Sequence, residues 1–198
     1  MKIVQIAGFL GSGKTTTIIA LSNIIARKNK KLAIIVNEIG EIPVDARIIN
    51  EYGLKVREIG GGCICCELLV NLVYTLEELR KFYNPDIVMI EPSGVAIPSS
   101  IDDSIKMIKN DIEKGPIIVI FDGERGEELL LDDELSKFIK RQLINANIIA
   151  INKIDVINED KIKYYEELLR AINPNAIILK ISAKNGIGLE LLADMVIK

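Results

Sequence analysis

The sequence predicts an α/β protein with a doubly wound, mostly parallel sheet and helices on both of its faces. Short apolar runs alternate regularly with amphipathic stretches along the whole chain. The runs are continuously apolar, as in strands that helices cover on both sides. The expected strands are 3–7, 32–36, 87–90, 117–121, 148–151 and 176–181. The expected helices are 14–27, 67–83, 98–110, 127–143, 160–172 and 187–197.

Length and composition predict a single domain over residues 1–198, with no separate C-terminal domain. Gly115-Pro116 and Asn173-Pro174 are expected in ordinary connections. No apolar run is long enough to span a bilayer, and the first strand starts at the N-terminus, so we expect neither a membrane partner nor a signal peptide. The net charge of −3 argues against nucleic-acid binding.

The segment Gly8–Thr15 connects the first expected strand to the first expected helix and fits the pattern G-x-x-x-x-G-K-[ST]. Its glycines let successive backbone N–H groups point at phosphate oxygens, and the helix N-terminus adds a positive dipole. Lys14 is expected to reach the β- and γ-phosphates, and the Thr15 hydroxyl to bind Mg²⁺. We therefore predict a nucleoside triphosphate site formed by Gly8, Gly11, Ser12, Gly13, Lys14, Thr15 and Thr16.

Two polar segments follow later strands, at the sheet edge where doubly wound folds bind ligands. Carboxylates near a triphosphate repel it unless a cation intervenes, so Asp45 or Glu41 is predicted to contact Mg²⁺ or another metal. An acidic surface loop is the alternative. Glu91 ends the third run and is predicted to be a second magnesium carboxylate, while Gly94 lets the backbone approach the γ-phosphate.

The segment Asn152–Asp155 directly follows the run 148–151 and indicates which base is bound. A carboxylate at Asp155 can accept hydrogen bonds from both N1–H and N2–H₂ of guanine, a pair of donors that adenine lacks. The stem of Lys153 can lie along the purine face, and Asn152 can brace the loop. A backbone N–H of the segment Ser182, Ala183, Lys184 can meet guanine O6. The sequence therefore predicts GTP and GDP as ligands in preference to ATP.

Three cysteines, Cys63, Cys65 and Cys66, lie within four positions after a run of glycines, and the chain contains no histidine. This grouping indicates soft-metal ligands and a reducing compartment, and we expect a cytoplasmic location. A closed structural zinc site takes four ligands, and the chain offers three thiols plus Glu41, which favours an open, exchangeable site. Small buried apolar residues or a redox pair remain alternatives.

In their order along the chain, these motifs resemble those of the CobW-type metallochaperone GTPases, a group that includes the hydrogenase and urease nickel-insertion GTPases. The resemblance covers nearly the whole chain, and its most specific part is the segment 61–66, Gly-Gly-Cys-Ile-Cys-Cys. It implies GTP hydrolysis, with Lys14 at phosphate, Thr15 at Mg²⁺, and Asp45 and Glu91 at the two switch regions. It also implies that the cysteines bind a transition metal, usually zinc, cobalt or nickel, for delivery to an apo-metalloprotein client.

Two departures from that family affect this interpretation. CobW-type proteins commonly carry a further C-terminal domain and often a histidine-rich stretch, and neither is expected in this chain. Nickel-insertion GTPases usually include a histidine in their metal motifs, and this sequence has none. No glutamine that orients the attacking water and no arginine finger can be assigned, so hydrolysis is expected to be slow without metal or client. A homodimer that forms with nucleotide and shares the metal is a further expectation. The alternative function is a GTP-responsive metal buffer in which hydrolysis is incidental.

Overall fold

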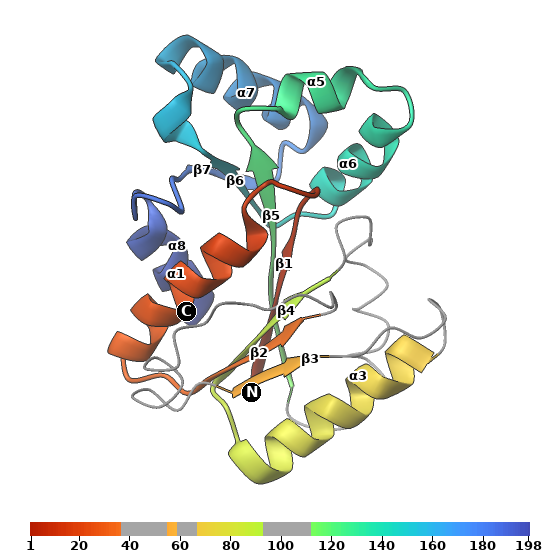
Figure 1. The fold of residues 1–198 in the computed structure, drawn as a ribbon, viewed down its shortest axis with the longest axis vertical. Helices are drawn as coiled ribbons and strands as arrows, with labels where there is room; N and C mark the ends of the chain where they lie inside the picture. The colour runs from red at the N-terminus through yellow and green to blue at the C-terminus, as the bar shows by residue number, and fades with distance from the viewer. Residues whose placement is uncertain (37–54, 59–66, 93–111) are drawn as a thin grey trace.

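The computed structural model describes residues 1–36, 55–58, 67–92 and 112–198 (Figure 1). In this part of the chain seven parallel strands form one sheet in the order β3-β2-β4-β1-β5-β6-β7. The strands are β1 Lys2–Ala7, β2 Leu32–Val36, β3 Lys55–Glu58, β4 Ile87–Glu91, β5 Glu113–Asp122, β6 Ile148–Asn152 and β7 Ile177–Lys180. The predicted α/β class is confirmed.

Helices cover both faces of the sheet (Figure 1). On one face, α1 (Lys14–Arg27) and α8 (Leu189–Ile197) pack against strand residues such as Val4 and Ile6. On the other face, α3 (Glu67–Glu78), the π-helical segment Leu79–Tyr83, α6 (Leu135–Ile144) and α7 (Glu159–Ile172) pack against residues such as Ile3 and Ala7. Neighbouring residues of β1 thus belong to different cores because side chains alternate along a strand. This two-sided burial explains the continuous apolar runs.

The strand order places the candidate site. Strands β2, β3 and β4 lie on one side of β1, and β5, β6 and β7 lie on the other. Doubly wound sheets bind ligands where the strand order reverses, at the carboxyl ends of the strands. The last residues of four neighbouring strands, Ala7, Glu91, Asp122 and Asn152, lie along this edge.

Several elements differ from the predictions, and the expected helix 98–110 lies outside the described residues. The edge strand β3 was not predicted, because its sequence Lys-Val-Arg-Glu is largely polar and the search used apolar runs. The stretch 127–143 divides into α5 (Gly126–Leu131) and α6. The division falls at Asp132, whose Oδ1 accepts the N–H groups of Glu134 (3.0 Å) and Leu135 (2.8 Å) and so stabilises a new helix start.

The prediction that Gly115-Pro116 lies in a connection was wrong, because both residues lie within β5. The pairing of β5 with β1 shifts register between Ile3 and Gln5, opposite this dipeptide. Proline has no N–H to donate, so a break in the ladder accommodates it. A Cβ atom on Gly115 would lie 2.8 Å from the carbonyl oxygen of Ile3, so the glycine permits the close approach of the two strands.

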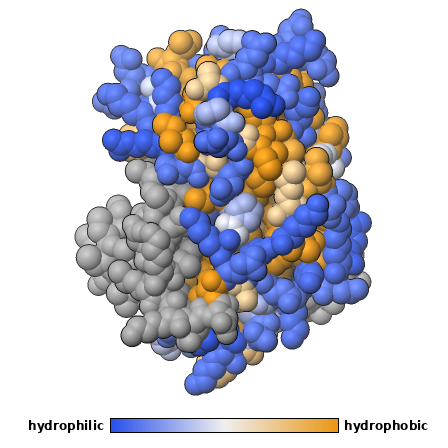
Figure 2. Space-filling view, turned by 180° about the vertical axis from the view of Figure 1, so that it is seen from behind, coloured by the Kyte–Doolittle hydropathy of each residue, from blue (hydrophilic) through white to orange (hydrophobic). Residues whose placement is uncertain are grey.

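The surface carries both hydrophilic and hydrophobic side chains. Apolar side chains reach it near the middle of the face seen from behind, between hydrophilic regions (Figure 2). Among the described helices, none has both the length and the apolar character that crossing a membrane requires.

Candidate nucleotide site

The loop Gly8–Gly13 connects β1 to α1 and is held against β5 and β6. Gly8 has φ +145°, and a Cβ atom there would lie 2.5 Å from the carbonyl oxygen of Ile120. Gly13 has φ +93°, and its Cβ would lie 2.4 Å from Nδ2 of Asn152. Both positions therefore require glycine on two grounds, conformation and space. The loop wraps the start of α1, where backbone N–H groups and the helix dipole favour an anion.

Thr15 and Glu91 meet at the carboxyl edge of the sheet. The Thr15 hydroxyl in the first turn of α1 donates to Oε1 of Glu91 at the end of β4, at 3.1 Å. Glu91 and Lys14 are both buried, with 7% and 6% exposure. Mg²⁺ binds oxygen ligands such as hydroxyl and carboxylate groups, so this pair fits the ion. The structure thus brings together two of the seven residues predicted to contact magnesium or another metal.

Asn152, at the end of β6, connects the phosphate loop with the segment after β7. Its Nδ2 donates to the carbonyl oxygen of Ser12 at 2.8 Å, and its Oδ1 accepts the N–H of Ala183 at 3.0 Å. The Asn152 side chain thus forms a bridge between these two segments, and the residue is buried, with 3% of its surface exposed. The Ala183 N–H, one of the groups considered for guanine O6, is bonded within the protein. The predicted phosphate and base segments are therefore neighbours in space.

An Asn152→Ala variant is expected to be less stable, because it leaves the Ser12 carbonyl and the Ala183 N–H without the amide that joins them. Losing these buried hydrogen bonds should lower the free energy of unfolding by about 1–3 kcal/mol. Urea denaturation measures this change, and Asn145→Ala at the exposed end of α6 serves as the control. Equal losses in both variants would show that the bridge does not stabilise the fold.

Asp122, which the sequence analysis did not identify, organises the next contacts. Its side chain is 1% exposed, and its Oδ2 accepts from Nζ of Lys153 at 2.9 Å. Glu124 binds the same ammonium at 3.2 Å. Burial lowers the pKa of Lys153, but the hydrogen bonds to Asp122 and Glu124 and the charges of these two carboxylates outweigh it, so the pKa lies above its ordinary value. The signal for Asp122 was its position: it follows the apolar run 117–121 at the ligand-binding edge.

Asp155 lies in the loop after β6, beside the segment after β7. A hydrogen bond from the Ser182 side chain lowers the pKa of Asp155 below its ordinary value. Burial acts in the opposite direction, and the residue's own N–H and the charge of Lys184 add to the lowering. Ser182 Oγ in turn accepts the N–H of Asn185 at 3.2 Å. The carboxylate is therefore kept ionised, the form that accepts two hydrogen bonds from guanine.

Other predicted site residues lie outside the described residues: Glu41, Asp45, Cys63, Cys65, Cys66 and Gly94. Within the described ranges, no group of three or more histidine, cysteine or acidic side chains is placed to hold a metal ion. The predicted thiol site therefore stays a prediction.

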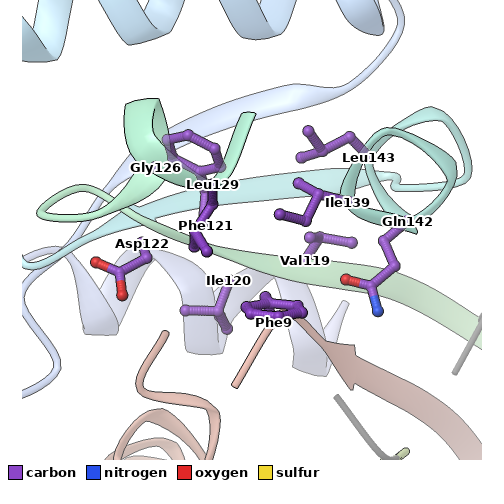
Figure 3. Close-up of a pocket in the computed structure, with 10 residues that line it drawn as sticks. All are labelled: Phe9, Val119, Ile120, Phe121, Asp122, Gly126, Leu129, Ile139, Gln142 and Leu143. Carbon is purple, nitrogen blue, oxygen red and sulfur yellow. The ribbon is translucent and has the colours of Figure 1, made fainter. Parts of the chain in front are cut away.

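A small cavity lies behind the phosphate loop, between β5 and helices α5 and α6 (Figure 3). Its volume is about 10 Å³, room for about one water molecule. Figure 3 shows Asp122 at one end and Gln142 at the other, with apolar side chains between them. The cavity cannot hold a nucleotide, so we place the candidate nucleotide site on the open edge along Gly8–Thr15, Asn152–Asp155 and Ser182–Lys184.

The sheet order and the glycine loop define a P-loop nucleotide-binding fold. Residues 2–180 match the family described as "CobW/HypB/UreG, nucleotide-binding domain". The chain belongs to this family, and the resemblance seen in its motifs is confirmed.

Three similar proteins illustrate the relationship. Zinc chaperone YeiR of Escherichia coli is 36% identical over 76% of this chain and 45% of its own length. Zinc-regulated GTPase metalloprotein activator 1 of Dictyostelium discoideum is 30% identical over 88% of this chain and 44% of its own. The crystal structure of hydrogenase maturation factor HypB from Archaeoglobus fulgidus superimposes with a TM-score of 0.67 at 22% identity, covering 98% of this chain and 87% of that one. The chain thus spans less than half the length of the first two relatives.

Proposed function

We propose that this chain is the GTP-hydrolysing part of a metallochaperone, in which the nucleotide state controls binding and delivery of a transition metal. The observation that carries the proposal is the bridge made by Asn152 between Ser12 in the phosphate loop and Ala183 in the segment after β7. Ser12 lies 140 positions before Asn152 in the sequence, and Ala183 lies 31 positions after it. The bridge therefore brings two distant motifs side by side. This proximity supports a site that takes both the phosphates and the base of one nucleotide.

The residues around the phosphate loop have separate roles in hydrolysis. Lys14, buried at the start of α1, places a positive charge where negative charge develops on the transferred phosphoryl group. The Thr15 hydroxyl and the Glu91 carboxylate would hold Mg²⁺, which, when bound, neutralises phosphate charge. Asp155 and the segment Ser182–Lys184 select guanine. We further propose Asp45 as a switch carboxylate near the phosphates, and Gly94 as a point where the backbone approaches the γ-phosphate.

The metal is proposed to be zinc, held by Cys63, Cys65 and Cys66 with Glu41 as the fourth ligand, and cobalt or nickel are alternatives. Two relatives carry zinc in their names, and thiolates suit zinc. In sequence, the cysteines lie between the loop that contains Asp45 and the strand that ends at Glu91. A change at the γ-phosphate can therefore be passed to the thiols through either neighbour. The client is an apo-metalloprotein, and a homodimer sharing the metal across its interface is a corollary.

Zinc titration in two nucleotide states tests the proposal. Zinc affinity is expected to differ between protein loaded with GDP and protein loaded with a non-hydrolysable GTP analogue, by about 5- to 150-fold, the usual range of allosteric coupling. Because coupling is reciprocal, zinc should change the affinity ratio of the two nucleotides by the same factor. Competition with a chromogenic chelator measures zinc affinity, and isothermal titration measures nucleotide affinity.

The matched control replaces all three cysteines, as C63S/C65S/C66S, and should abolish tight zinc binding while GDP binding persists. Equal zinc affinity in both nucleotide states would contradict a chaperone cycle. That result would favour a metal buffer in which hydrolysis is incidental.

A further inference from the structure

A turn over residues 123–125 connects β5 to α5 beside the two segments proposed to bind the nucleotide. Oδ1 of Asp122 accepts the N–H groups of Glu124 (3.0 Å) and Arg125 (3.2 Å). The N–H of Gly123 donates to the carbonyl oxygen of Asn152 at 3.0 Å. The turn is thus tied to the end of β6 and closed on the buried Asp122 carboxylate.

The far end of the turn is anchored in the core. Gly126 packs so closely on the ring of Phe121 that a Cβ atom there would lie 2.3 Å from Cζ. The next N–H, that of Glu127, donates to the Tyr165 hydroxyl at 3.0 Å. Tyr165 is fully buried and meets Phe121 edge to face, with ring centroids 5.0 Å apart. The backbone of Arg125 therefore has a fixed position.

The Arg125 side chain extends from this turn to the phosphate loop. Its Nη1 lies 3.6 Å from the position that a Cβ atom on Gly11 would occupy. Its ion pair with Glu128 is long, 3.8 Å from Nε to Oε2, and both side chains are well exposed, at 44% and 75%. Exposed pairs of this kind stabilise little, so the guanidinium can exchange Glu128 for a stronger anion.

The sheet order indicates which phosphates this guanidinium faces. Arg125 follows β5, whereas Glu91 ends β4, and these strands flank β1 on opposite sides. The Arg125 side also carries Lys153, which binds Glu124 of the same turn and belongs to the base-binding segment. The Glu91 side carries the proposed magnesium and γ-phosphate contacts. The loop backbone at Gly11 lies between them, where P-loop N–H groups cradle the α- and β-phosphates.

We propose that Arg125 binds the α- and β-phosphates of the nucleotide and so contributes equally to the affinity for GDP and for GTP. This inference rests on the nucleotide site proposed above. A guanidinium offers paired N–H donors that match two phosphate oxygens. Since GDP and GTP share these two phosphates, the contact raises nucleotide affinity without distinguishing the two states.

Isothermal titration with GDP and with the analogue GppNHp tests this role. Arg125→Ala should raise the Kd for both nucleotides by the same factor, roughly tenfold, as expected for loss of a partly exposed, charge-assisted contact. Arg125→Lys keeps the charge but loses the paired donors, and should fall between wild type and alanine. The control is Arg27→Ala in the last turn of α1, where the arginine is 62% exposed and paired with Glu190. Thermal melting checks that each variant is folded.

Three outcomes would overturn the inference. Unchanged affinity of Arg125→Ala for both nucleotides would show that the guanidinium does not touch them. A loss confined to GppNHp would place Arg125 at the γ-phosphate. Failure of the wild-type chain to bind either nucleotide would refute the proposed function itself, and a wild type that binds normally separates the two failures.

Discussion

GTP hydrolysis by a Lys14→Ala variant is expected to fall by about 10²- to 10³-fold, the usual loss when one preorganised charge or donor is removed from a transition state. Lys14 is 6% exposed at the start of α1, in the first turn that also presents Thr15 to Glu91. Alanine keeps the helix and removes the ammonium, so the loss should appear in turnover and not in folding. A phosphate-release assay at saturating GTP measures it.

The matched control for this experiment is Lys163→Ala. Lys163 is an exposed lysine of α7 and is not among the predicted site residues. Unchanged turnover in Lys14→Ala would contradict the assignment of Lys14 to the transferred phosphoryl group. Equal losses in both variants would indicate a general effect of removing positive charge.

Nucleotide selection should depend on Asp155. We expect the wild type to prefer GTP to ATP strongly, and Asp155→Asn to reduce that preference on the order of 10²-fold, because the amide cannot accept both guanine donors. Competition titrations of GTP against ATP give the ratio directly. The phosphate site should stay intact, so affinity for inosine or xanthosine nucleotides separates a changed base preference from a general loss of binding.

The pH dependence of this preference has a defined sign. The Ser182 hydroxyl holds the pKa of Asp155 below its ordinary value, so the carboxylate, the form proposed to bind guanine, persists as pH falls through the usual aspartate range. Ser182→Ala should raise that pKa, and the preference for GTP should then be lost at a higher pH. Asp160→Asn, an exposed aspartate in the first turn of α7, is the control. Equal affinity of the wild type for ATP and GTP would contradict the base assignment altogether.

The contacts around Asp122 connect the two segments that are proposed to bind the base and the phosphates of the nucleotide. Asp122 binds Lys153 of the base-binding segment through one oxygen and closes the turn that carries Arg125 through the other. Asn152 joins the same segment to the phosphate loop. The proposed base-binding and phosphate-binding segments are therefore joined through two buried polar side chains, Asp122 and Asn152.

Sequence alone determined the class of fold and most of its elements. The strands of a doubly wound sheet are buried on both faces, so they appear as apolar runs, and the phosphate loop needs glycines and a lysine at fixed spacing in one continuous segment. Each of these requirements concerns residues that are close together in the chain, so each can be recognised in a short stretch of sequence. For the same reason, β3 was overlooked: an edge strand of largely polar residues lacks the apolar run.

Tertiary structure alone decided the contacts between segments that are distant in the chain. Nothing near Asn152 in sequence predicts that its amide reaches both Ser12 and Ala183, and nothing near Arg125 points to Gly11. These contacts follow from the order of the parallel strands in the sheet, which places the carboxyl ends of β1, β5 and β6 along one edge. The sequence determined which groups are available for nucleotide chemistry, and the packing of the sheet decided which of them face one another.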